Sequence, residues 1–343
     1  MTFDPRLRSP KERPLFVIGL FLSGIAWLVL LVSIVGALYG LVGLAFVLMA
    51  HALLLAHVRG NGVRVSENQL PDLHARCREI ASKLGLTQVP EVYLLQSNGL
   101  LNAFATKLLS RRYVVLLSSL VEGCEDPGQL DFVIGHEMAH LAAGHLSWNA
   151  VLLPFRLVPW LGPAYSRACE YTCDRAGLAV CGGLEPAARG LVVLAAGGKT
   201  AAQVNLDAFM AQRAETGAFW MAILELSSSH PFLCKRVAAL QEFVRPGSVP
   251  EVGRNPLAYP FSPIFAIAAG PTGGAGAMGL VVMIGILAAI AVPNFIKFQE
   301  RAKQKAAQQL RHQMLQMQQD QEPDEPSEDG QQAVPARHQQ PAR

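Results

Sequence analysis

The residues best suited to chemistry lie at positions 136–140, which read His-Glu-Met-Ala-His. On a helix, residues four apart differ by about 40° in azimuth, so His136 and His140 project from one face and can share a tetrahedral Zn²⁺ ion. Glu137 lies at the edge of that face and could carry a proton from an activated water to a leaving amine. The flanking residues are mostly apolar, and burying these polar side chains without a partner would be costly. The pattern therefore predicts one zinc ion per chain, with Glu137 as the general base.

A catalytic zinc ion needs a third protein ligand and an open position for water. His145 is nearest in sequence, but it lies about 140° around a continuous helix from His140, so we interpret it as a surface or capping residue. Glu170 is the better candidate, because residues 166–174 read as a second helix on which Glu170 and Asp174 share a face. Glu170 would bind the metal, and Asp174 would accept a hydrogen bond from the far nitrogen of a zinc-bound histidine. An ordinary solvated helix face is the alternative.

Several elements are predicted around these residues. The segment Asp126-Pro-Gly-Gln129 has the pattern of a helix start, and that helix should run to about residue 147. Another helix is predicted over residues 71–84, and β-rich runs at 91–97 and 113–119, with a third strand over 102–106, predict a sheet. The fold class is therefore α+β: a mainly helical zincin-type metallopeptidase domain with a small β-sheet, plus transmembrane helices.

Residues 15–57 run almost without charge and are long enough for two membrane-crossing helices, since one crossing needs about 20 apolar residues. We predict a hairpin that turns near residues 36–40; one tilted span plus a buried helix is the alternative. Basic residues precede and follow the hairpin. The positive-inside rule then places both ends, and the metallopeptidase domain, on the cytoplasmic side of a bacterial-type inner membrane. Membrane lipid is thus an expected partner.

Residues 277–295 form a third long apolar run, after a Gly/Pro-rich linker. Three crossings from a cytoplasmic N-terminus would carry the basic residues that follow to the far side, so the side on which the tail lies is left open. The expected division is 1–58 for the hairpin, 59–250 for the metallopeptidase domain, 251–298 for the linker and C-terminal membrane helix, and 299–343 for a disordered tail rich in Gln and charge.

Charge and cysteine usage exclude some classes. The net charge of +3 is small, and no basic stripe interleaved with aromatic residues is present, so no nucleic-acid partner is expected. The six cysteines form neither a CxxC pair nor a dense framework, which predicts reduced thiols, most of them buried. Cys169 and Cys173 lie four apart beside Glu170, which leaves redox tuning or metal capture open.

Residues from about 90 to 240 resemble the HtpX-type heat-shock proteases and CAAX prenyl proteases, which are membrane zinc metallopeptidases of the gluzincin group. The matching motifs, in the family's order, are Asn102-Ala-Phe-Ala105, Gly135-His-Glu-Met-Ala-His140, Glu170 with Asp174, and Ser229-His230-Pro231 followed by Arg236.

The resemblance implies roles for residues outside the metal-binding motif. Asn102, Ala103, Phe104 and Ala105 would form an edge strand that pairs with an extended polypeptide substrate. His230 would help to stabilise the tetrahedral oxyanion, and Arg236 would brace the acidic pair Glu170 and Asp174. From the residues alone, His230 is as easily a loop histidine and Arg236 a cation on a helix face.

Two regions depart from the resemblance. HtpX-type proteins place further membrane spans between HExxH and the glutamate ligand, whereas here the apolar run 148–165 is too broken by Arg156 and prolines to span, and predicts a lid or membrane-surface element. The spans are also too few for the chamber of the prenyl proteases, which disfavours prenylated substrates.

Residues 284–295 resemble the N-terminal helix of type IV pilins but lack the processing site and early glutamate. We interpret them as a borrowed membrane helix whose small residues would suit a homo-oligomer.

The expected function is that of a membrane-anchored zinc endopeptidase, active in protein quality control, that cleaves misfolded or membrane proteins. The alternative is a non-proteolytic membrane scaffold or pilus-associated protein in which zinc is structural or the site is vestigial.

Overall fold

The computed structural model describes residues 3–96, 101–268, 296–309 and 311. Contacts divide the chain into one unit over Met1–Gly279 and a second over Leu280–Arg343. In the second unit, residues 296–309 are helical and exposed. The predicted third span and its pilin-like segment, and most of the predicted disordered tail, lie outside the described residues.

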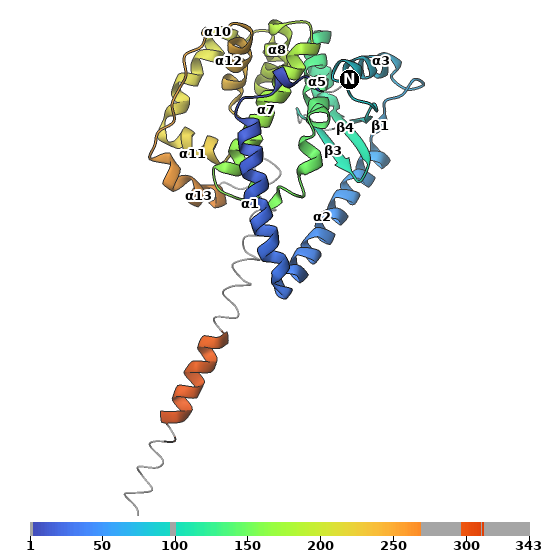
Figure 1. Cartoon of the computed structure of the whole chain (residues 1–343). Coiled ribbons are helices and arrows are strands. Elements are labelled where there is room, and N and C mark those ends of the chain that lie inside the picture. Colours follow the sequence, from blue (N-terminus) through green and yellow to red (C-terminus); the bar gives the residue numbers. More distant parts are fainter. Residues whose placement is uncertain (1–2, 97–100, 269–295, 310, 312–343) are drawn as a thin grey trace, which may run out of the picture. The chain divides into compact units, whose positions relative to one another are not determined.

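The described residues of the first unit form a small mixed sheet, shown beside α3 and α5 in Figure 1. Its strand order is β1-β2-β4-β3, with β2 parallel to β4 and the other two pairs antiparallel. Alternate residues of β4 enter two cores: Val114 and Leu116 face the main core, while Val115 and Leu117 pack with Leu55 near the end of α2. The strands are β1 (Val63–Arg64), β2 (Glu91–Leu95), β3 (Ala103–Leu108) and β4 (Arg111–Leu117).

The predicted strands are present with shifted bounds. The third strand runs on to Leu108 and forms a hairpin with β4 through Leu109, whose φ of 54° is in the left-handed region. The run predicted to end at residue 119 instead leaves the sheet after Leu117, and α4 (Ser118–Gly123) begins there. The α+β class is confirmed, with helices dominating.

Helix α5 (Pro127–Ala142) runs through the middle of the domain and packs closely on α7 (Leu161–Val180). It begins as predicted, with Pro127 in the first turn and the Asp126 carboxylate accepting a hydrogen bond from Gly128 N at 2.6 Å. The two helices approach closely at a glycine: a Cβ on Gly135 would lie 2.4 Å from Val180 Cγ2. A side chain at position 135 would therefore separate the helices that carry the predicted ligands.

The end of α5 differs from the prediction. The helix stops at Ala142 rather than near residue 147, because Gly144 takes a left-handed conformation with a φ of 84°. A 3₁₀ turn, η2 (His145–Trp148), follows it. This break redirects His145, and the calculation for a continuous helix does not apply to it.

Two helices at the N-terminus are long and apolar enough to cross a membrane, as predicted: α1 (Glu12–Val32) and α2 (Ile34–Asn61). They meet at Ser33, a little before the predicted turn, where the serine hydroxyl accepts a hydrogen bond from Gly36 N. From that turn they diverge toward the domain as a V in Figure 1. The pair suggests membrane association, and the predicted orientation stays a prediction.

The hairpin is joined to the domain along α1. Gly19 lies against the ring of Phe155, and Ser23 Oγ accepts a hydrogen bond from Phe155 N at 3.2 Å. Phe155 belongs to α6 (Leu153–Arg156), so part of the predicted lid segment 148–165 packs on α1. The role of this segment as a lid and the domain boundaries stay predictions.

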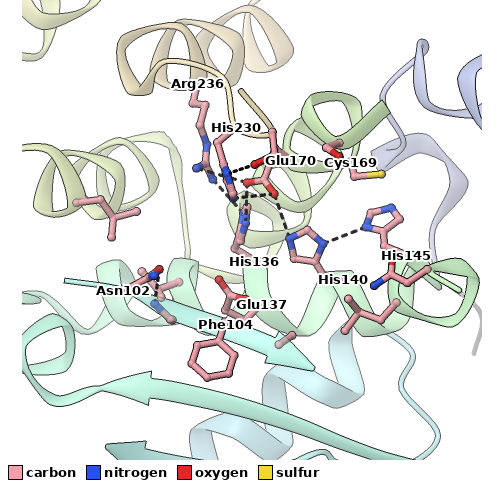
Figure 2. A pocket seen from close by; sticks show the side chains of 18 of the residues that line it. Asn102, Phe104, His136, Glu137, His140, His145, Cys169, Glu170, His230 and Arg236 are labelled. Atoms are coloured by element: carbon pink, nitrogen blue, oxygen red, sulfur yellow. Dashed lines mark hydrogen bonds and ion pairs between the residues drawn. The ribbon is translucent and has the colours of Figure 1, made fainter. Parts of the chain in front are cut away.

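Further helices surround α5 and α7. Predicted helix 71–84 is observed as α3. The loop between α11 and α12 faces the predicted ligands (Figure 2). The remaining elements are η1 (Pro5–Leu7), α3 (Pro71–Lys83), α8 (Leu184–Ala196), α9 (Gly198–Ala201), α10 (Leu206–Ala211), η3 (Gln212–Gly217), α11 (Phe219–Ser227), α12 (Leu233–Val244) and α13 (Ala258–Ala268).

Candidate metal centre

The two histidines of α5 and the glutamate of α7 converge at one point (Figure 2). His136 Nε2 lies 3.4 Å from Glu170 Oε2, and His140 Nε2 lies 3.4 Å from Glu170 Oε1. The ligand atoms of all three residues lie within 4.8 Å of one another. The sequence argument therefore brought together side chains that are neighbours in space.

These separations fit a tetrahedral ion better than they fit hydrogen bonds. Bonds of about 2.0–2.2 Å from zinc to nitrogen and oxygen put two ligand atoms of a regular tetrahedron about 3.4 Å apart. Hydrogen bonds would bring the same atoms to about 2.9 Å. Glu170 Oε2 is buried and has no hydrogen-bond partner, which a cation at the centre would remedy. Two nitrogens and one carboxylate are also a donor set that zinc accepts.

The pKa shifts of Glu170 and His136 indicate that the site favours positive charge. Burial by itself raises the pKa of Glu170, but the two histidines outweigh it and hold that pKa well below its usual value. Burial likewise lowers the pKa of His136, yet Asp174 and Glu170 together raise it to about 10. A proton on His136 or a metal ion at the centre would meet the same demand.

The far nitrogen of His136 is held as predicted for a metal-bound imidazole. Its Nδ1 lies 3.0 Å from Asp174 Oδ1, and Arg236 binds both oxygens of the same carboxylate at 2.6 and 2.9 Å. Arg236 Nη1 also lies 3.5 Å from Glu170 Oε2. Asp174 and Arg236 are both buried. The geometry supports a bracing role for them, although their roles as such stay predictions.

Glu137 and His230 lie on the walls of a cavity of about 330 Å³ that opens over the three ligands. Glu137 is next to Phe104 of β3 in Figure 2. The side chain of His230 is 57% exposed, and its Nε2 lies 3.5 Å from Glu170 Oε1. Its Nδ1 is 2.9 Å from Ser229 Oγ. Both residues can therefore reach a molecule bound in the cavity.

Strand β3 forms one side of the same cavity. It pairs with β4 alone among the described strands, so its other edge is open. Asn102, Ala103, Phe104 and Ala105, the predicted substrate-binding residues, all line the cavity. An extended peptide added to this edge would pass over the predicted ligands.

The interpretation of His145 as a surface or capping residue is wrong. Its side chain is 6% exposed, and its Nδ1 lies 3.2 Å from Nδ1 of His140. The signal that could have found it was Gly144, a residue that commonly ends a helix in the left-handed region.

Sequence reasoning also missed Arg167, one turn before Glu170. Its Nη1 donates hydrogen bonds to the carbonyl oxygens of Glu225 at 2.6 Å and Ser228 at 2.7 Å. These two residues lead into the loop that carries His230, so Arg167 ties that loop to the helix of Glu170. An arginine on a helix gives no sequence signal for such a role.

All six cysteines are free. Burial raises the pKa of the Cys169 and Cys173 thiols, which keeps them protonated and poorly reactive at neutral pH. Reduced, buried thiols were predicted.

Comparison with known proteins agrees with the geometry. The model of the family described as "Peptidase family M48" matches residues 67–158 and 149–244, which together are more than half of the chain and include nearly all of the site. The chain is 32% identical over 181 residues to "Plastoglobule-localized metallopeptidase 48, chloroplastic" of Arabidopsis thaliana, an alignment that covers 48% of this chain and 52% of that protein.

This chain therefore spans about half the length of the curated relative it matches. No solved structure matches it. The resemblance to HtpX-type and CAAX proteases, inferred from the motifs, is confirmed at the level of the family. The chain belongs to peptidase family M48.

Proposed function

We propose that this protein is a zinc-dependent endopeptidase attached to a membrane by the α1–α2 hairpin. The observation that carries the proposal is the pair of 3.4 Å separations between the Glu170 oxygens and the two histidine Nε2 atoms. Glu137 and the unpaired edge of β3 lie on the walls of the same cavity. His136, His140 and Glu170 would hold zinc. When bound, zinc supplies a Lewis acid that polarises a carbonyl group and makes a water molecule more acidic.

The chain's own residues would supply the remaining steps. The open edge of β3 binds the substrate in an extended form, through main-chain hydrogen bonds. Glu137 takes the proton of the attacking water and passes it to the departing amine. His230 donates a hydrogen bond to the oxyanion of the tetrahedral intermediate. Asp174, oriented by Arg236, keeps a proton on Nδ1 of His136 so that Nε2 is free to bind the metal.

Misfolded or membrane proteins are the proposed substrates, since the hairpin would keep the cavity close to a lipid surface. The basic residues on either side of the hairpin favour a domain on the cytoplasmic face. The curated relative is named for a plastoglobule location, which belongs to that protein.

The test is cleavage of casein by the detergent-solubilised full chain. Glu137→Gln should keep zinc but lower the cleavage rate about 10²- to 10⁴-fold, because it cannot accept the proton. Glu122→Gln, at an exposed position of α4 that does not line the cavity, is the control and should cleave as the wild type does.

Wild-type rates in Glu137→Gln would refute the mechanism. If neither protein cleaves casein although both bind zinc, the non-proteolytic scaffold is the better account.

A further inference from the structure

His145 lies between a predicted zinc ligand and the first residue of the membrane hairpin. Its Nδ1 is 3.2 Å from Nδ1 of His140, and its Nε2 is 3.3 Å from Oε1 of Glu12. The side chains of His145 and Glu12 are both buried, and the contact of His145 Nε2 with Glu12 is an ion pair that has not closed into a hydrogen bond. Figure 2 shows the two imidazoles of His140 and His145 side by side, with the interaction drawn between them.

His140, His145 and Glu12 form a row, and metal binding by His140 would fix which ring nitrogens in it carry protons. His140 can bind a metal through Nε2, which faces Glu170, only if its proton is on Nδ1. That proton points to Nδ1 of His145, which must then accept it. His145 consequently carries its own proton on Nε2, which faces the carboxylate of Glu12. One arrangement of protons therefore satisfies the whole row, from the carboxylate to the metal side of His140.

Glu12 is held in place from other directions. Arg8 forms an ion pair with one of its oxygens and the hydroxyl of Thr172 on α7 donates a hydrogen bond to the other. Thr172 Oγ1 in turn accepts a hydrogen bond from Ser9 N at 2.8 Å, and Arg8 Nη2 donates to Ala143 O at 2.9 Å. The start of α1 is thus tied both to α7 and to the end of α5.

The same residues could hold a metal ion of their own, since ligand atoms of Glu12, His145 and Cys169 lie within 4.8 Å of one another. The ion pair with Arg8 argues against this, because the guanidinium already compensates the carboxylate and would repel a second cation. A row of this kind accounts for the contacts without an added ion, once the 3.3 Å contact of His145 Nε2 with Glu12 closes into a hydrogen bond.

We propose that Glu12 and His145 form a hydrogen-bond relay that orients His140 for zinc and so couples the metal centre to the first turn of the membrane hairpin. This inference rests on the zinc site of the proposed function. It makes the two sides of the centre alike: a carboxylate acts directly on His136, and a carboxylate acts on His140 through His145. Any displacement of α1 from the domain would break the relay.

The experiment measures the zinc affinity of the full chain in detergent by competition with a chromophoric chelator. His145→Leu should weaken zinc binding about 10- to 100-fold, the loss usual for an outer partner of a metal-bound histidine. His145→Asn, whose side-chain oxygen can accept the proton of His140 Nδ1, should recover most of the affinity. Glu12→Gln should weaken binding less than His145→Leu does.

Two further readouts separate a relay from general packing. In a His145→Leu background, Glu12→Gln should cause no additional loss, because the row is already broken. The visible spectrum of the cobalt-substituted protein should change in His145→Leu, since the orientation of His140 sets the ligand field. Ser23→Ala removes a different buried contact between α1 and the domain and should leave zinc affinity unchanged.

The relay is wrong if His145→Leu binds zinc as the wild type does, if Ser23→Ala weakens binding equally, or if the Glu12→Gln loss persists in the His145→Leu background. Should His145→Leu fail to fold, Glu12→Gln is compared in the wild-type and His145→Asn backgrounds: the relay predicts a loss of zinc affinity in the first and none in the second, because the shorter asparagine does not reach Glu12. Glu170→Gln distinguishes the two proposals: unchanged zinc affinity in that variant removes the zinc site itself, whereas a loss there with no effect at His145 removes only the relay.

Discussion

Two buried glutamates, Glu170 on α7 and Glu225 on α11, look alike by burial and yet have opposite surroundings. Each has one carboxylate oxygen with no hydrogen-bond partner, and for each the surrounding charges hold the pKa below its usual value despite burial. Glu225 Oε2 receives Lys235 Nζ at 2.7 Å and Arg254 Nε at 2.8 Å. Glu170 faces two imidazoles at 3.4 Å, and its one guanidinium neighbour, Arg236, stays 3.5 Å from Oε2 while it binds both oxygens of Asp174.

The difference lies in the partners. Lysine and arginine carry permanent charge and reach hydrogen-bond distance, so the charge of Glu225 is compensated within the protein. Imidazoles are neutral when they bind metals, and the longer separations leave room for an ion. An unpartnered carboxylate oxygen therefore does not by itself mark a metal site, and the chemistry of the facing side chains decides. Glu225 ties α11 to α12 and to the segment of Arg254.

The largest expected contrast is in zinc binding. Glu170→Gln removes the anionic ligand and should lower zinc affinity by more than about 100-fold, beyond the loss usual for an outer partner. Glu225→Gln should bind one zinc ion per chain as the wild type does. Metal content of the purified proteins after dialysis, measured by plasma emission, checks both. Equal zinc content in the two variants would show that Glu170 is not the zinc ligand.

In stability the two variants should differ the other way: Glu225→Gln should lose more than Glu170→Gln, by a smaller effect than the one on zinc binding. Glu225→Gln leaves two cations near each other, and breaking a buried pair costs about 3–5 kcal/mol. Because the Arg254 side chain is 30% exposed, we expect about 2–3 kcal/mol in the free energy of unfolding. Urea unfolding of the metal-free proteins at pH 7 measures it.

The stability contrast should also depend on pH. Arg254 and Lys235 depress the pKa of Glu225 in the folded state, against the effect of burial. The contribution of its charge is therefore fully present above the unfolded-state pKa of about 4.5 and is lost as the pH falls through the lower folded-state pKa. The difference between the wild type and Glu225→Gln should shrink on acidification below about pH 4.5. A difference that is constant from pH 7 to pH 3 would assign the loss to packing instead.

Local sequence patterns predicted which side chains gather at the candidate metal centre. Residue spacing paired His136 with His140, and Asp126-Pro127 located the start of their helix within a residue. Glu170 and Asp174 followed from a second helical pattern.

The contacts of His145 with Glu12 join distant parts of the chain. Glu12 lies more than 130 positions before His145, and hydrophobic periodicity says nothing about which distant segment returns to a site. The apolar run 15–57 was predicted to form a membrane hairpin, with one tilted span plus a buried helix as the alternative; Leu55 near its end and Val58 just beyond it pack on the sheet. A membrane span and a helix that covers a sheet face have the same apolar composition, so the sequence could not separate them.

The smallest predicted effect concerns the glycine whose importance the sequence argument missed. Gly144→Ala puts a side chain in a left-handed conformation, with a φ of 84° and nothing within 4 Å of the added Cβ, so strain and not a clash sets the cost, about 1–2 kcal/mol. Gly182 has a φ of 89° and equally open surroundings, which makes Gly182→Ala a matched control. Both variants should lose similar stability in urea unfolding. Only Gly144→Ala should also weaken zinc binding, by up to about tenfold, because relaxation of the turn moves His145 away from His140. Equal zinc affinity in the two variants would show that the turn at Gly144 ends the helix without positioning the ligand.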